Sequence, residues 1–222
     1  GDGLFFTSKD FGGDLVITDT VMTRNTGGHW TQVSTGTTTN AGTPVLNIAK
    51  SATPTTFAVS ATGSYAITVS NASTATSATT GAYIVSDTLP TGITAVLPIP
   101  ASGWGTGWDC SASTATVVSC TNSAALIPGA SAPVITVPVS IGASAASPSV
   151  NTARVSGGGD TTCPATGTTA AHCQASVSTA VNAPGLTVKK TLQGNLVVGV
   201  PTSYLITVTN SGGIPLNPVT VT

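Results

Sequence analysis

The sequence of 222 residues contains no glutamate, and charged side chains of all kinds make up only 6 % of it. In a typical soluble protein about a quarter of the residues are charged. The formal net charge is -1, so the chain has neither the basic field that attracts nucleic acid nor a polybasic patch for a membrane surface. Nucleic acid is therefore not an expected partner.

Long apolar runs are absent as well. The chain has no stretch of roughly eighteen apolar residues, the length that a membrane-spanning helix needs. It begins at Gly1 without the charged and apolar regions of a signal peptide, so we expect that a signal peptide, if one existed, has been removed. No segment of helical length places apolar residues on one helical face. A helical fold is therefore not expected.

Catalytic and metal-binding patterns are also missing. The many serines are not accompanied by a GxSxG elbow, and His29 and His172 have no partner at metal-ligand spacing. The cysteines contain no CxxC pair. The sequence therefore predicts a protein that is not an enzyme, with no catalytic residues, no metal and no cofactor.

What the sequence contains instead is a recurrent alternation of apolar and polar residues. It is seen in FAVS (57–60), YAITVS (65–70), ATVVSC (115–120), PVITVPVSI (133–141) and YLITVTN (204–210). These segments are rich in β-branched residues and are bounded by Gly, Pro, Asn or Ser, as short strands are. They predict an all-β chain of antiparallel immunoglobulin-like sandwich modules. Tyr65, Tyr83 and Tyr204 are expected in the core with their hydroxyls at its rim.

Part of the chain is repeated. Residues 46–71 read LNIAKSATPTTFAVSATGSYAITVSN and residues 186–210 read LTVKKTLQGNLVVGVPTSYLITVTN, which pairs Leu46, Lys50, Tyr65 and Asn71 with Leu186, Lys190, Tyr204 and Asn210. Such a period predicts tandem modules. We expect an N-terminal β extension at 1–43, a complete module at 44–183 and an incomplete second repeat of about three strands at 184–222.

The four cysteines form two pairs of equal spacing, Cys110 with Cys120 and Cys163 with Cys173. Both pairs flank Ser/Thr/Ala-rich segments that have the pattern of hairpins, in which two strands bring cysteines within bonding distance. Two local disulfides indicate an oxidising compartment, such as the periplasm, the cell surface or the medium. The alternative is four reduced, buried thiols.

Six segments in this order resemble a known family: LNIAKSATP, GSYAITVSN, SDTLPTGI, WDC with VSCTN, LIPGASAPVITVPVSI and VNTARVSGGGD. Together they are similar to the bacterial surface repeat called domain of unknown function eleven, an immunoglobulin-like module found in tandem in large secreted and cell-wall proteins. The resemblance covers about 46–160 in full and 186–222 in part. It implies a non-enzymatic repeat of stalks, adhesins, surface layers or fibres.

Charged residues are scarce within the complete module. Between 46 and 157 they are Lys50, Asp87, Asp109 and Arg154, and Lys50 and Asp87 each follow an apolar strand. In bacterial surface immunoglobulin-like domains a first-strand lysine, a last-strand asparagine and a buried acid form an isopeptide bond, because an apolar site favours the neutral amine. The resemblance implies this role for Lys50, Asn151 and Asp87. The alternative is a solvated Lys50, an Asp87 that caps a turn and an Asn151 that ends a strand.

Trp104 and Trp108 lie in SGWGTGWDC, next to a cysteine. They are candidate ligand contacts, since aromatic rings stack on sugars, or they pack against the disulfide as core. Two function classes follow. One is an extracellular structural protein of the bacterial cell surface, a subunit of a filament or stalk. The other is an adhesin or glycan-binding module that uses the tryptophan loops.

The incomplete repeat suggests how copies could assemble. Three strands would leave an apolar face and open edges exposed, which β-proteins avoid by covering or pairing them. Either the chain continues past Thr222 or another subunit completes the fold. The strand pattern DLVITDTV (14–21) echoes YIVSDTL (83–89). We expect residues 1–43 of one copy to add strands to the C-terminal half-repeat of the next, giving a homopolymer that does not close.

Overall fold

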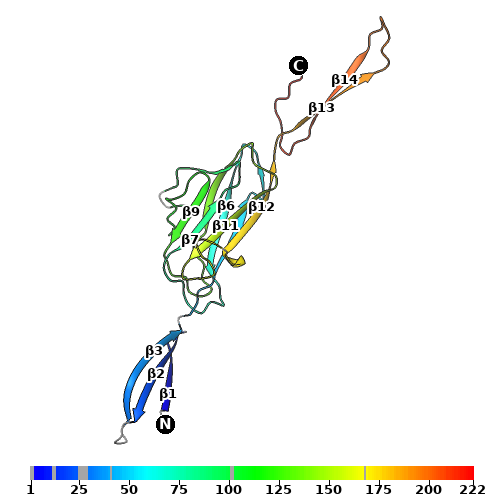
Figure 1. Cartoon of the computed structure of the whole chain (residues 1–222). Helices are drawn as coiled ribbons and strands as arrows, with labels where there is room; N and C mark the ends of the chain where they lie inside the picture. The colour runs from blue at the N-terminus through cyan, green and yellow to red at the C-terminus, as the bar shows by residue number, and fades with distance from the viewer. Residues whose placement is uncertain (1–2, 12–13, 25–29, 41, 101–102, 168) are drawn as a thin grey trace.

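The computed structural model describes residues 3–11, 14–24, 30–40, 42–100, 103–167 and 169–222, with side chains from residue 42 onward. Fourteen strands and one short 3-10 turn make up its regular structure, and no α-helix occurs in these ranges. The predicted all-β architecture is confirmed. Figure 1 shows the strands as three successive groups: a sheet of the first forty residues, a central sandwich and a C-terminal hairpin.

The N-terminal group is a meander of β1 (Gly3–Phe11), β2 (Asp14–Arg24) and β3 (Trp30–Asn40). Its strand order is β1-β2-β3, and both pairings are antiparallel. The echo segment 14–21 lies in β2, which is the middle strand. Its two edges are therefore already occupied, and only the outer edges of β1 and β3 are free for a further strand within this sheet.

Two facing sheets form the central sandwich. One has the order β4-β6-β10-β8 and the other the order β5-β12-β11-β7-β9. All pairings are antiparallel except the short one between β5 and β12. The strands are β4 (Leu46–Thr53), β5 (Thr56–Ala58), β6 (Thr62–Asn71), β7 (Tyr83–Thr88), β8 (Ile93–Ala95), β9 (Val117–Asn122), β10 (Ile135–Ile141), β11 (Ser149–Gly157) and β12 (Gln174–Asn182).

The core lies between these sheets, and it follows from the alternation in the sequence. Along β7, β10 and β11 every second residue is buried, so one face of each strand carries the apolar side chains. Aromatic rings meet edge to face in two places, Phe57 with Tyr65 at 5.6 Å and Tyr83 with Trp108 at 5.5 Å between centroids. The sandwich thus has a continuous apolar interior, in which a buried polar group costs free energy unless it has a partner.

The C-terminal group is a hairpin of β13 (Leu186–Gln193) and β14 (Ser203–Asn210). The expectation of about three strands in 186–222 is wrong, because these are the two strands of that range. Residues 211–222 read SGGIPLNPVTVT, and the glycines and prolines in this segment disfavour a ladder. In the described part of the chain β14 pairs with β13 alone.

The hairpin reproduces the register of its counterpart in the sandwich. Leu46 pairs with Asn71 and Lys50 with Ile67 in β4–β6, while Leu186 pairs with Asn210 and Lys190 with Ile206 in β13–β14. The lysine also lies over the corresponding tyrosine ring in both, at 4.4 Å for Lys50 and Tyr65 and 4.3 Å for Lys190 and Tyr204. The sequence repeat is therefore also a structural repeat.

Candidate functional site

Lys50, Asp87 and Asn151 converge in the core of the sandwich. Lys50 is on β4 of one sheet, whereas Asp87 on β7 and Asn151 on β11 belong to the other. Ala153 of β11 pairs with Asp87, so Asn151, two residues away on the same face of β11, points into the same part of the interior. Asp87 and Asn151 are 1 % and 0 % exposed.

One carboxylate oxygen binds both other groups. The Lys50 ammonium donates to Asp87 Oδ2 in an ion pair whose two side chains are fully buried. Asn151 Nδ2 donates to the same oxygen at 3.2 Å. The attacking amine and the leaving amide nitrogen of the expected reaction therefore share one proton carrier. The alternative of a solvated Lys50 is wrong, because its side chain has no solvent contact.

Burial changes the protonation of the lysine. It lowers the pKa of Lys50 from its ordinary value of 10.5, although the charge of Asp87 and the hydrogen bond to it act in the opposite direction. An amine is nucleophilic only without its proton, so this change favours attack on a carbonyl.

Tyr65 closes the site from β6. Its hydroxyl is buried, not at the rim of the core as the sequence predicts, and it has no hydrogen-bond partner among the described residues. Burial, followed by the charge of Asp87, raises the pKa of Tyr65 to about 12, and the nearby polar side chains of Asn151 and Ser149 offset part of the rise. From the sequence Tyr65 is expected only as a core residue. The signal that could have revealed one is the repeated Lys and Tyr spacing.

Both predicted disulfides are present, Cys110–Cys120 and Cys163–Cys173. The first links β9 to the segment before it, next to an antiparallel bridge between Asp109 and Thr121. The second closes the loop between β11 and β12, where Cys173 ends the 3-10 turn η1 (Ala171–Cys173). The alternative of four reduced thiols is therefore wrong.

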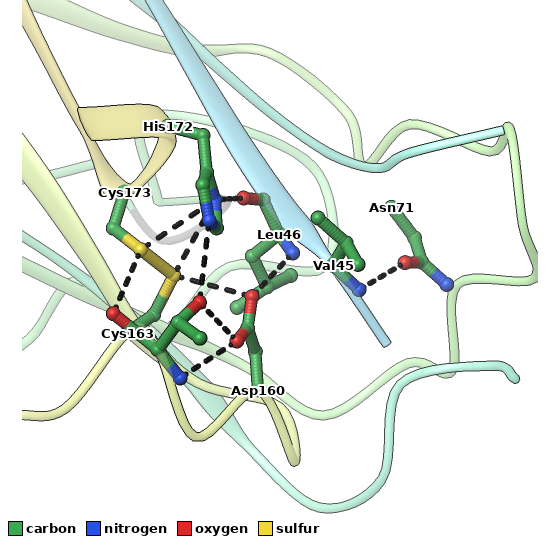
Figure 2. Close-up of a disulfide and its surroundings, with 8 residues drawn as sticks. Val45, Leu46, Asn71, Asp160, Cys163, His172 and Cys173 are labelled. Atoms are coloured by element: carbon green, nitrogen blue, oxygen red, sulfur yellow. Dashed lines mark hydrogen bonds between the residues drawn. A yellow bond between two sulfur atoms is a disulfide. The ribbon is translucent and has the colours of Figure 1, made fainter. Parts of the chain in front are cut away.

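Next to the second disulfide, two side chains bind the backbone of Leu46 at the start of β4, as Figure 2 shows. Asp160 Oδ2 accepts the Leu46 N–H at 2.8 Å, and His172 Nδ1 donates to the Leu46 carbonyl at 2.6 Å. β4 is an edge strand, so these side chains satisfy backbone groups that a further strand would otherwise pair with. We call Asp160, His172 and the Cys163–Cys173 disulfide the Leu46 clamp.

A tight glycine turn places Asp160 there. Gly157, Gly158 and Gly159 all have positive φ, at 90°, 62° and 82°. A Cβ on Gly157 would lie 2.6 Å from the Ala82 carbonyl oxygen, and one on Gly159 would lie 2.2 Å from Thr80 Oγ1. Only glycine fits these positions, which accounts for the GGG that precedes Asp160.

The Leu46 clamp has the residue types of a metal site. Asp160, Cys163, His172 and Cys173 each place one donor atom within 4.8 Å of the others. Zinc binds cysteine as thiolate, whereas here the two sulfurs are bonded to each other at 2.01 Å. In this oxidised form the cluster therefore anchors a loop.

The tryptophans pack in the interior. Trp104 and Trp108 are 5 % and 4 % exposed, and Trp108 Nε1 donates to the Pro133 carbonyl at 2.7 Å. A ring that stacks on a sugar must present a face to solvent. The adhesin alternative therefore gains no support from these side chains.

No protein-family model and no curated protein matches the chain. Among solved structures it is similar to BcpA, the major pilin subunit of Bacillus cereus, with 14% identity and a TM-score of 0.44 over 97% of this chain and 71% of that one. It is also similar to the T6 backbone pilin of serotype M6 Streptococcus pyogenes, with 13% identity and a TM-score of 0.37 over 86% of this chain and 47% of that one.

A third similar structure is the Corynebacterium diphtheriae major pilin SpaA, which "points to a modular pilus assembly stabilizing isopeptide bonds". The identity is 18% and the TM-score 0.34, over 77% of this chain and 44% of that one. This chain thus spans about half the length of two of the three pilins. No helix in its described residues is long and apolar enough to cross a membrane. Similarities this low do not establish a shared function.

Proposed function

We propose that this chain is a non-enzymatic structural protein of the bacterial cell surface, a subunit of a filament or stalk, whose sandwich is locked by an isopeptide bond between Lys50 and Asn151. The observation that carries the proposal is the convergence of Lys50 and Asn151 on one oxygen of Asp87 in a site without solvent contact. The desolvation cost of a buried ion pair can exceed its Coulombic gain, so stability alone does not explain the pair. Formation of a covalent bond would explain it.

The reaction balances without a co-reactant. The neutral Lys50 amine attacks Cγ of Asn151 and gives up a proton to Asp87, which passes a proton to the departing nitrogen. One N–C bond forms, one breaks, and ammonia leaves. The product joins β4 to β11, and these strands lie in opposite sheets.

Such a bond would redirect force through the module. The chain enters the sandwich at β4 and leaves it after β12, so tension would pass from Lys50 directly to Asn151. Residues 51–150 would then carry no load and could not be pulled out. This behaviour suits a subunit that holds something away from a cell.

Single-molecule pulling tests the proposal. The native chain and Asn151→Ala would be stretched between handles at their ends, under oxidising conditions. Asn151→Ala should release about 90 additional residues, which is roughly 30 nm of extended chain, because residues 51–150 outside the Cys110–Cys120 loop become free to extend. Equal extension of the two proteins would show that no Lys50–Asn151 bond carries the tension.

The assembly that we propose runs head to tail through strand addition. β14 has a free edge in the described part of the chain, and the hairpin exposes Leu186, Val188, Tyr204, Leu205 and Ile206. In the sandwich the counterpart of that edge, on β6, is covered by β10. β2 is paired on both sides, so the added strand would be β1 or β3 of the neighbouring copy.

Deleting residues 1–43 tests this contact. The deletion should abolish polymers, as seen by electron microscopy and sedimentation, while both disulfides still form in the remaining protein and show that the sandwich folds. Polymers of the same kind from the truncated chain would show that assembly uses another surface.

A further inference from the structure

The hydroxyl of Tyr65 lies in the site but takes no part in the proposed reaction of Lys50 with Asn151. The Tyr65 hydroxyl is one of several polar side-chain atoms that are buried without a hydrogen-bond partner in the described residues, and Asn151 Oδ1, Asp87 Oδ1 and Ser149 Oγ are others. Unpaired buried polar atoms are rare and call for an explanation. Three of these residues belong to the same site, because Tyr65 and Asp87 both contact Lys50 and Asn151 donates to Asp87.

Negative charge develops on one of these unpaired atoms, Asn151 Oδ1, during the reaction. When the Lys50 amine attacks Cγ of Asn151, the carbonyl electrons move onto Oδ1, which becomes negative in the tetrahedral intermediate. Asp87 Oδ2 is already occupied by Lys50 and by Asn151 Nδ2. The oxygen side of the amide therefore needs a different donor, and a preorganised donor at an oxyanion is a large contribution to catalysis.

Resting on the proposed Lys50–Asn151 bond, we infer that the Tyr65 hydroxyl is a catalytic residue, which donates a hydrogen bond to Oδ1 of Asn151 as the tetrahedral intermediate forms. The ring of the same residue lies over Lys50, with the ammonium 4.4 Å from its centroid. One side chain thus orients the nucleophile by its face and stabilises the oxyanion by its hydroxyl.

The protonation of Tyr65 fits this role. Its pKa is raised to about 12, with burial as the main cause, so the hydroxyl keeps its proton wherever the Lys50 amine is neutral enough to react. Ser149 has a competing hydroxyl, because it lies two residues before Asn151 on the inward face of β11 and its Oγ is also buried without a partner in the described residues. The test must separate the two.

The measured quantity is the rate of ammonia loss after synthesis. Each variant would be made in a short pulse of oxidising cell-free synthesis, quenched in acid at intervals and weighed intact. Tyr65→Phe keeps the ring over Lys50 and removes only the hydroxyl. It should slow the reaction roughly 100-fold, as loss of one oxyanion donor does, while Ser149→Ala should react faster than Tyr65→Phe.

Tyr204→Phe is the matched control, because Tyr204 holds Lys190 in the same geometry, at 4.3 Å, on the exposed hairpin. It should react at the native rate. If Tyr65→Phe fails to form both disulfides, site-specific fluorotyrosine at Tyr65 replaces it, since a more acidic hydroxyl should then accelerate the reaction. If Tyr65→Phe or the fluorotyrosine variant lost ammonia at the native rate, the role inferred for Tyr65 would be wrong, while the proposed Lys50–Asn151 bond would stand. A native chain that never loses ammonia would overturn the proposed bond as well.

Discussion

The Lys50 ammonium and the Asp87 carboxylate form an ion pair between the two sheets of the sandwich, and neither side chain is accessible to solvent. A proton can pass from one to the other along their hydrogen bond without changing the net charge of the core. Asn151 donates to the same oxygen from the neighbouring strand. This is the arrangement that the proposed cross-link requires.

Replacing Asp87 by Ala should prevent the cross-link and destabilise the fold. The change removes the proton carrier and leaves the Lys50 amine buried without its acid, which costs about 3–5 kcal/mol in buried pairs. Asn151→Ala is the control, since it also lacks the bond but keeps the ion pair. Urea unfolding should place Asp87→Ala below Asn151→Ala by that amount. Equal midpoints would show that the pair contributes nothing beyond the bond.

Tyr65 should ionise late. Burial raises its pKa to about 12, above the ordinary 10.0. The unfolded chain therefore loses this proton first, and the contribution of Tyr65 to stability is present below pH 10.0 and is lost as the pH rises through about 12. Ultraviolet titration of tyrosinate should reveal a component near 12 that is missing from Tyr65→Phe. If the two titration curves agree at high pH, the hydroxyl is not in the buried environment described here.

Asp160→Ala should loosen the entry strand of the sandwich. Asp160 accepts the buried Leu46 N–H, and an unpaired buried donor costs about 1–3 kcal/mol. Burial alone would raise the pKa of Asp160, but hydrogen bonds from Thr162 and Leu46 and the nearby His172 hold it below the ordinary 3.8. This contribution is therefore present above pH 3.8 and is lost as the pH falls through the lower folded value.

The measurement is unfolding free energy as a function of pH for the native chain and Asp160→Ala. The two curves should lie apart at neutral pH and converge in acid. Thr161→Ala is a suitable control, because it alters a neighbouring exposed side chain of the same loop. A constant difference at all pH values would show that the ionised carboxylate is not what holds Leu46.

Much of this fold can be read from the sequence because alternation with period two determines which residues face the core. The strands, both cysteine pairs, Lys50 and Asp87 follow from such local patterns and from the scarcity of charge, whereas Asn151 is a candidate only through the family resemblance. The Leu46 clamp does not, since Asp160 and His172 reach a backbone 114 and 126 positions away. Contacts of that range depend on how the sheets stack, which periodicity does not encode.

Other features that the sequence did not predict also depend on contacts between distant segments. Residues 194–202 and 211–222 contain apolar side chains but no strand of the hairpin, because a ladder needs a partner as well as propensity. Residues 14–21 were predicted to form a strand and do so in β2. Their own sequence does not show that this strand lies in the middle of a sheet. The burial of the Tyr65 hydroxyl likewise depends on strands distant in sequence.

The most direct test of the account is the intact mass of the purified native protein, followed by peptide mapping under non-reducing conditions. With both disulfides formed, the mass should be lower by about 17 Da than those two bonds explain, the loss of one ammonia in the condensation. Mapping should yield a branched peptide that joins Lys50 to Asn151. A mass that the two disulfides account for in full, with Lys50 and Asn151 recovered in separate unmodified peptides, would contradict the proposed cross-link.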